Sequence, residues 1–177
     1  MPPSYSAGVR FSLGNTELPA HIERLRTEER VDLIVLLSHL GFAQDAKLAA
    51  EVPGIDVLVS GHTHNRLYQP VKIGQTVIIQ SGCHGSFVGR LDLTLDGGKI
   101  VDVQHALICT DDSITSDPDM ALMVRDTLAP HRDFLDNVVG QVRSPLDRAT
   151  SLETSMDNVL LDAISAAAET RLAFSNG

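Results

Sequence analysis

Three histidines have the residue type and spacing of metal ligands. His62 and His64 lie in a Gly-His-Thr-His segment that follows a run of nearly pure aliphatic residues, and His39 follows an earlier run of the same kind. Histidines at i and i+2 point roughly the same way if the chain stays extended, so both imidazoles could reach a common centre. Imidazole is a common ligand for zinc, iron and nickel. Taken alone, the pair has a plainer interpretation as two polar loop residues.

The elements that would position these histidines form a β-α-β pattern. The apolar runs at 31–38 and 55–60 have the length of strands buried on both faces, and residues 43–51 between them look helical. Ligand sites in α/β sheets gather at the carboxyl ends of neighbouring parallel strands. We therefore expect His39 to converge with the other two histidines, and three imidazoles could hold one zinc ion with an open position. Asp56, inside the second strand, is expected to be structural.

The remaining segments indicate a mixed α/β chain. A surface helix is predicted at 18–30 and further helices at 117–136 and 155–170, with Pro130 expected to break or kink the first of these two. An Asp-Gly-Gly turn signal at 96–98 predicts a hairpin between the last two of four short strands. These strands are expected at 71–73, 76–80, 87–95 and 100–108. We place a domain boundary near residue 140.

Composition limits the partners that the protein can have. The chain has 177 residues, 43% of them hydrophobic, and a formal net charge of −9 without a cluster of Lys or Arg. It can bury one core, and its charge argues against nucleic acid or an anionic membrane surface as the main partner. No segment has the roughly 20 apolar residues of a membrane span, and the first residues do not form a signal peptide. Whether Cys83 and Cys109 pair is left open.

Longer strings around these histidines resemble a known family. LSHLGFAQDAKLAAEVPGIDVLVSGHTH, followed by QSGCHGSFVGRLDL, is similar to the calcineurin-like metallophosphoesterases, specifically the 5′-nucleotidase branch, which includes the thiosulfohydrolase of bacterial sulfur oxidation. The resemblance implies that residues 1–140 are the C-terminal half of a four-layer α/β/β/α sandwich. Residues 141–177 would begin a second, substrate-binding α/β domain.

The resemblance also implies a cofactor and a reaction. His39 and His62 would bind one divalent ion and His64 a second, each ion being Mn, Zn or Fe. The two ions would activate a water that hydrolyses a small phosphoester, such as a nucleotide or sugar nucleotide. His84, in a glycine-rich turn, would contact substrate, although a loop histidine that only shapes the turn is an equally good interpretation. A periplasmic or secreted location follows from the family, while the lack of a signal peptide leaves the cytoplasm open.

Part of the family pattern does not occur in this sequence. The family's Asp-x-His, Gly-Asp and Asn-His segments are absent before His39, so the catalytic residues are expected upstream of this chain. Without a bridging carboxylate, two cations would repel each other, and the 177 residues alone are expected to be inactive. The last residues, 174–177, look like the beginning of a substrate-binding segment. Such a fragment would expose sheet edges and tend to aggregate.

Two other functions stay open. One is a thiosulfohydrolase-type reaction on a sulfur-linked substrate, which the Ser-Gly-Cys-His-Gly stretch at 81–85 leaves open. A non-catalytic remnant or interaction domain could retain only a mononuclear metal site. The other histidines, His21, His105 and His131, have no partners in the sequence pattern and are interpreted as ordinary surface or core residues. Substrate identity and oligomeric state cannot be derived from the sequence.

Overall fold

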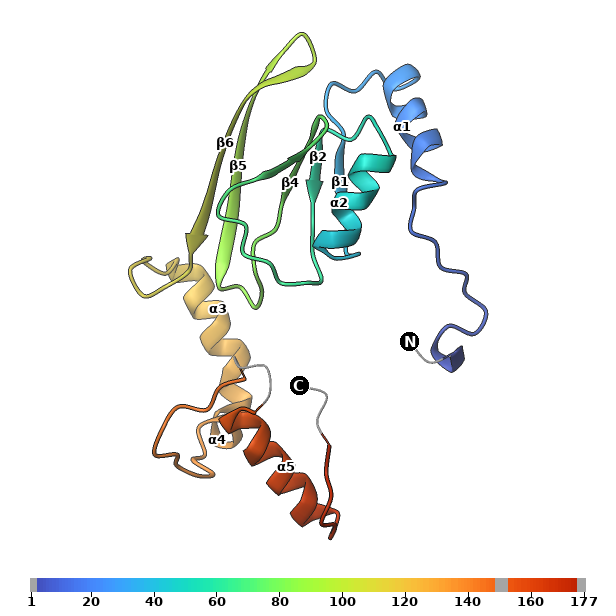
Figure 1. Cartoon of the computed structure of the whole chain (residues 1–177). Coiled ribbons are helices and arrows are strands. Elements are labelled where there is room, and N and C mark those ends of the chain that lie inside the picture. Colours follow the sequence, from blue (N-terminus) through green and yellow to red (C-terminus); the bar gives the residue numbers. More distant parts are fainter. Residues whose placement is uncertain (1–2, 149–152, 175–177) are drawn as a thin grey trace. The chain divides into compact units, whose positions relative to one another are not determined.

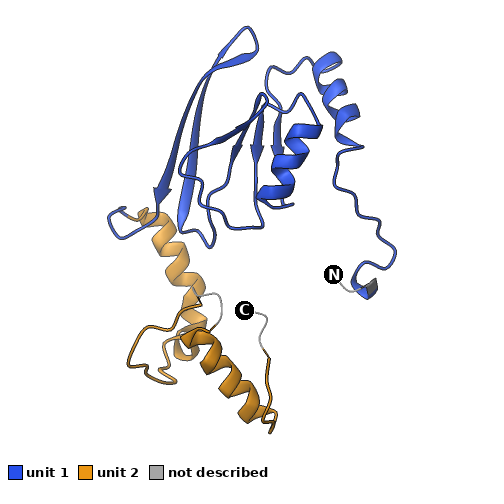
Figure 2. Ribbon diagram, viewed as in Figure 1, with its two compact units in different colours: residues 1–115 blue, residues 116–177 orange. Residues whose placement is uncertain are grey.

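The computed structural model describes residues 3–148 and 153–174 and has the α/β fold that the sequence predicts. It divides into two compact units, Met1–Thr115 and Ser116–Gly177 (Figure 2). The candidate metal ligands and His84 lie in the first unit. The expected substrate-binding segment at 174–177 lies, except for Phe174, outside the described residues.

The first unit is built on a four-stranded sheet with the order β1-β2-β4-β3 (Figure 1). Its central strands are parallel, and β3 pairs with β4 antiparallel. The predicted β-α-β unit is confirmed as β1, α2 and β2. The elements up to this sheet's last strand are η1 (Pro3–Tyr5), α1 (Leu18–Thr27), β1 (Val35–Leu37), α2 (Phe42–Glu51), β2 (Val57–Val59), β3 (Val71–Ile73) and β4 (Thr76–Ile79).

A long hairpin completes the first unit. Strands β5 (Phe87–Asp96) and β6 (Lys99–Cys109) pair antiparallel, with a register shift between Thr94 and Leu95. Their turn contains the two glycines of the predicted Asp-Gly-Gly signal, Gly97 and Gly98, both with positive φ. The hairpin lies on the β4 side of the sheet (Figure 1).

The core of the first unit lies between the sheet and the two helices α1 and α2. Leu58 on β2 is fully buried, as the aliphatic run at 55–60 predicts, and Ile78 on β4 is fully buried as well. The expectation that the run at 31–38 is buried on both faces is wrong. Val35 is 54% exposed and Leu37 is 80% exposed, because β1 is an edge strand and no described element covers their face of it. Ile34, by contrast, belongs to the core.

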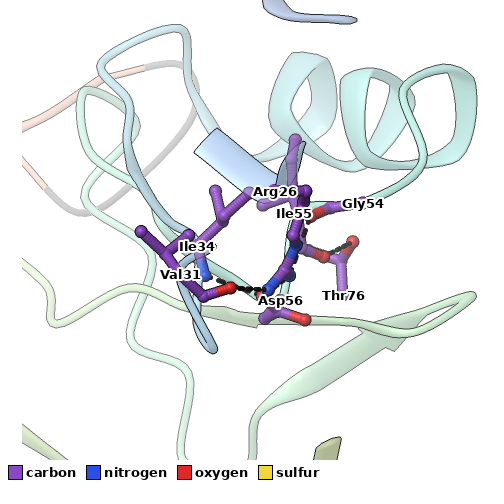
Figure 3. A network of polar contacts seen from close by, with 7 residues as sticks. All are labelled: Arg26, Val31, Ile34, Gly54, Ile55, Asp56 and Thr76. Atoms are coloured by element: carbon purple, nitrogen blue, oxygen red, sulfur yellow. Dashed lines mark hydrogen bonds and ion pairs between the residues drawn. The ribbon is translucent and has the colours of Figure 1, made fainter. Parts of the chain in front are cut away.

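A polar network connects the residues just before strands β1 and β2 to helix α1 (Figure 3). Arg26 donates to the carbonyl of Val31 at 2.9 Å and forms an ion pair with Asp56. The Asp56 carboxylate also accepts a hydrogen bond from the backbone amide of Ile34 at 2.7 Å. These contacts confirm that Asp56 is structural, and they lie at the opposite strand ends from the histidines.

The second unit is helical in its described residues. It contains α3 (Pro118–Leu128), η2 (Ala129–His131), α4 (Arg132–Leu135) and α5 (Ser155–Ala167). The break at Pro130 is confirmed, since η2 separates α3 from α4. The compact units meet between Thr115 and Ser116, and the domain boundary near residue 140 stays a prediction. None of the helices in the described ranges is both long and apolar enough to cross a bilayer.

Candidate metal centre

His39 and His62 come together at the carboxyl ends of β1 and β2. The two strands pair in register, so that Leu37 lies opposite Val59 and the residues that follow each strand leave the sheet side by side. The imidazole rings of His39 and His62 have centroids 5.0 Å apart and planes at 62°. Both side chains are exposed. The sequence predicts this convergence, and the structure contains it.

His64 lies beside a different histidine. Its ring centroid is 5.6 Å from that of His84, which lies in the turn between β4 and β5. The chain does not stay extended here, since φ is +75° at His62 and +57° at His64, so the condition for both rings to point the same way is not met. The backbone amide of Thr63 donates to the carbonyl of Gly61 at 3.0 Å, which closes a tight turn around His62. Each ring of the His-Thr-His segment therefore has its own neighbour.

Unusual backbone conformations concentrate at these histidines. Five described residues other than glycine have positive φ, and three of them are His62, His64 and His84. Left-handed conformations are uncommon for residues with a Cβ, and such strain tends to be kept where it serves a site. The three imidazoles are thus presented by turns that the surrounding structure must enforce.

Two glycines allow the ligand-bearing turns to approach each other. A Cβ on Gly61 would lie 2.9 Å from Nδ1 of His39, so only glycine leaves room for that ring. A Cβ on Gly41, whose φ is +94°, would lie 2.7 Å from the Cγ2 atom of Thr63. The Oγ1 atom of Thr63 in turn accepts a hydrogen bond from the amide of Phe42, the first residue of α2. The turns after β1 and β2 therefore interlock.

Gln80 holds the turn that carries His62 and His64. Its side chain is 2% exposed and follows directly after β4. Its Nε2 donates to the carbonyl of Gly61 at 2.7 Å, and its Oε1 accepts from the amide of Asn65 at 3.0 Å. One buried amide group thus spans both ends of the turn.

Asp45 is a second buried polar residue at this end of the sheet. It is fully buried in the first turn of α2, and its carboxyl group accepts hydrogen bonds from the hydroxyls of Ser38 and Ser60, both at 2.5 Å. Sequence reasoning missed Asp45 and Gln80. The signal for Asp45 is its position on the apolar face of the helix, at i−3 and i−4 from Leu48 and Ala49. The signal for Gln80 is its place at the end of a buried aliphatic run.

The donor set fits the imidazole part of a metal site. Two imidazoles that share a tetrahedral ion at metal–nitrogen distances of about 2 Å place their ring centroids roughly 5 Å apart. The His39–His62 and His64–His84 pairs have separations of this size. Across residues 3–148 and 153–174, however, no three His, Cys, Asp or Glu side chains form a group that could hold an ion. The described chain supplies imidazole pairs without a carboxylate beside them.

The cysteines and one further histidine lie outside this arrangement. Cys83 is half-buried, Cys109 is exposed, and both are free thiols. His105, on β6, has both ring nitrogens buried without a hydrogen-bond partner. It is half-buried as a residue.

Several curated proteins are similar to this chain over most of its length. No family model matches it. The trifunctional nucleotide phosphoesterase YfkN of Bacillus subtilis is 26% identical over 170 residues, covering 88% of this chain and 12% of that protein. A snake venom 5′-nucleotidase from Naja atra is 27% identical over 171 residues, covering 84% of this chain and 32% of the relative. The chain therefore spans less than a third of these curated relatives.

The structural comparison agrees with the sequence comparison. The sulfate thiohydrolase SoxB of Thermus thermophilus superposes with a TM-score of 0.78 and 28% identity, over 96% of this chain and 31% of that structure. The relatives carry names of hydrolytic enzymes, and the similarity extends over both compact units of this chain. By sequence and by fold, the chain is similar to the 5′-nucleotidases and related metallophosphoesterases.

Proposed function

We propose that this protein is the histidine-bearing part of a metal-dependent phosphoester hydrolase of the 5′-nucleotidase type. His39 and His62 hold one divalent ion, and His64 holds a second. The substrate is a small phosphoester, with a nucleotide or sugar nucleotide as the first candidates, because the relatives include a nucleotide phosphoesterase and a 5′-nucleotidase. Mn, Zn and Fe are the candidate ions. The venom relative supports a secreted or periplasmic location.

The single observation that carries this proposal is the pairing of His39 with His62. Their ring separation of 5.0 Å matches two imidazoles on one ion, and the rings come from neighbouring strand ends rather than from one flexible loop. Gly61 leaves space for His39, and Asp45 connects the residues that precede both turns. An arrangement built from glycines and buried polar groups favours a ligand site over two solvated loop histidines.

The charge of the chain supports the same conclusion. A phosphoester is anionic, whereas this chain has a net charge of −9. Bound divalent ions would supply the missing positive charge, polarise the phosphoryl oxygens and lower the pKa of a bound water. The ring centroid of His84 lies 5.6 Å from that of His64, so His84 is placed to contact an anionic substrate group at the second ion.

We further propose that these 177 residues do not turn over substrate by themselves. Two ions in one centre need a carboxylate to offset their repulsion. Among the residues whose positions are described, no Asp or Glu completes a group with the histidines. The imidazoles can therefore bind a metal without completing a dinuclear centre.

A second candidate function is hydrolysis of a sulfur-linked substrate. The observation in its favour is the superposition on the sulfate thiohydrolase, which covers nearly the whole chain. In this case His39, His62 and His64 would hold the same ions, and the substrate would be a thiosulfate group carried on a partner protein. The two candidates differ in the leaving group and not in the metal ligands.

Zinc binding with single histidine variants tests the metal part of the proposal. The full chain is titrated with Zn²⁺ in a calorimeter, together with His39→Ala, His62→Ala and the control His131→Ala. We expect the first two variants to lose binding and the control to retain it. Equal zinc affinity in all four proteins would refute the assigned ligands. A second experiment distinguishes the two substrates and the non-catalytic alternative. It measures phosphate release from AMP and sulfate release from a thiosulfate-carrying protein, each in the presence of Mn²⁺ or Zn²⁺. We expect this chain alone to release neither product.

A further inference from the structure

Asp45 lies at the centre of the contacts between the two histidine-bearing turns. Among the described residues, Asp45 is the only fully buried one with an ionisable carboxyl or basic group. It belongs to α2, the helix between β1 and β2. Burying a carboxyl group opposes folding unless its hydrogen bonds are satisfied. An apolar residue on this face of α2 would fill the core more favourably. A buried carboxyl group at this position of α2 therefore points to a role beyond packing.

The hydrogen bonds of Asp45 reach both turns at equivalent places. Oδ1 accepts from the hydroxyl of Ser38, the residue before His39, and Oδ2 accepts from the hydroxyl of Ser60, two residues before His62. The two bonds have the same length, 2.5 Å, so one carboxyl group is shared evenly between the two strand ends.

The two serines are themselves fixed to the backbone around the histidines. The amide of Ser38 donates to the carbonyl of Val59, and the amide of Ser60 donates to that of Ile79, both at 2.9 Å. The Ser38 hydroxyl also accepts from the amide of Leu40 at 3.3 Å, which closes the turn around His39. A displacement of either hydroxyl would therefore move the turn that carries the imidazole.

We propose that Asp45 is a positioning residue that sets the separation of the His39 and His62 imidazoles by holding Ser38 and Ser60 on a single carboxyl group. This inference rests on the proposed function, because the separation of the two imidazoles matters only if they bind an ion. The positioning itself can be measured in the chain without metal. Residues that orient ligands without touching the metal affect metal affinity by about 10–100-fold when they are replaced.

The test compares Asp45→Asn with a matched control on the same sheet. Asparagine has nearly the same shape, but its NH₂ group cannot accept the second hydroxyl proton. The control is Thr76→Val, which removes another buried hydrogen bond, from Thr76 Oγ1 to the carbonyl of Ile55 at 2.7 Å, at the opposite strand ends (Figure 3). A general loosening of the fold would affect both variants, whereas a positioning role affects only the first.

The readout is the imidazole C–H resonances of the full metal-free chain, followed by zinc titration. In Asp45→Asn we expect the His39 and His62 resonances to shift and broaden, those of His64 and His84 to stay, and the zinc affinity of the His39–His62 pair to fall about tenfold. Thr76→Val should leave all four resonances and the affinity unchanged. Unchanged His39 and His62 resonances in Asp45→Asn, or equal changes in the two variants, would overturn the inference.

Single serine variants keep the test decisive if Asp45→Asn does not fold. Ser38→Ala should perturb mainly His39, and Ser60→Ala mainly His62, since each removes one of the two bonds. Absence of any selective effect in both would overturn the inference. If the resonances respond as expected but the wild-type chain does not bind zinc, the positioning role stands and the proposed metal function fails, so the two failures are distinguishable.

Discussion

Gly61 lies directly against His39, and a Cβ atom at Gly61 would come within 2.9 Å of the imidazole Nδ1. The same added atom would also lie 3.4 Å from the carbonyl oxygen of Ser38. The glycine that begins the second ligand turn thus determines where the ligand of the first turn can lie. Its small size is required by the neighbouring histidine.

Gly61→Ala should therefore displace His39 while leaving the fold in place. The φ of Gly61 does not lie in the left-handed region, so alanine causes no backbone strain of its own and acts only by contact. We expect the zinc affinity to fall severalfold and the thermal midpoint to change little. Gly140→Ala is the control, since an added Cβ there has no neighbour within 4 Å. Equal zinc affinity in both variants would show that His39 does not depend on this contact.

Replacing Gln80 should loosen the turn around His62 and His64. Gln80→Leu leaves the carbonyl of Gly61 and the amide of Asn65 without their buried partner. Each unsatisfied buried group costs about 1–3 kcal/mol, so urea denaturation should show a loss of this size or larger. Gln80→Glu keeps the acceptor for Asn65 but loses the donor to Gly61, and we expect an intermediate loss. A Gln80→Leu variant as stable as the wild type would show that the Gln80 side chain does not hold this turn.

Part of this arrangement could be derived from the sequence, and part could not. The convergence of His39 and His62 follows from two aliphatic runs separated by a helix, because parallel strands in register end at the same edge. The left-handed turns at His62 and His64 could not be derived in this way. They depend on the side chain of Gln80, which contacts the turn from more than ten residues further along the chain. Local sequence patterns do not encode such contacts.

The edge strand shows the same limit. A run of Val, Leu and Ile predicts burial on both faces, but burial depends on which elements cover the strand. In the described chain, Ile34 contributes to the core while Leu37 is 80% exposed. The exposed edge itself agrees with the expectation from the family pattern. Aggregation of the isolated chain stays a prediction.

Leu37→Lys tests that prediction. An uncovered aliphatic edge strand is a template for pairing between chains, and a lysine there opposes it. We expect light scattering of the concentrated chain to decrease, without loss of the thermal transition, because the side chain already faces solvent. Val101→Lys, at a residue 59% exposed on the hairpin, should change scattering less. A similar decrease in both variants would point to net charge as the cause.

Zinc should also stabilise the chain in a histidine-dependent way. An ion that binds only the folded state at about 100 times its dissociation constant adds about 2.7 kcal/mol of stability. The melting temperature should rise with zinc and return after EDTA is added. His39→Ala should abolish this rise, whereas His21→Ala should not. Stabilisation that survives His39→Ala would place the ion elsewhere.

The central claim is that His39 and His62 share one ion, and anomalous diffraction from zinc-loaded crystals of the full chain tests it most directly. We predict an anomalous peak between the two imidazoles, about 2 Å from one nitrogen of each ring. A zinc peak bound by other side chains, with the His39 and His62 rings free of metal, would contradict the account.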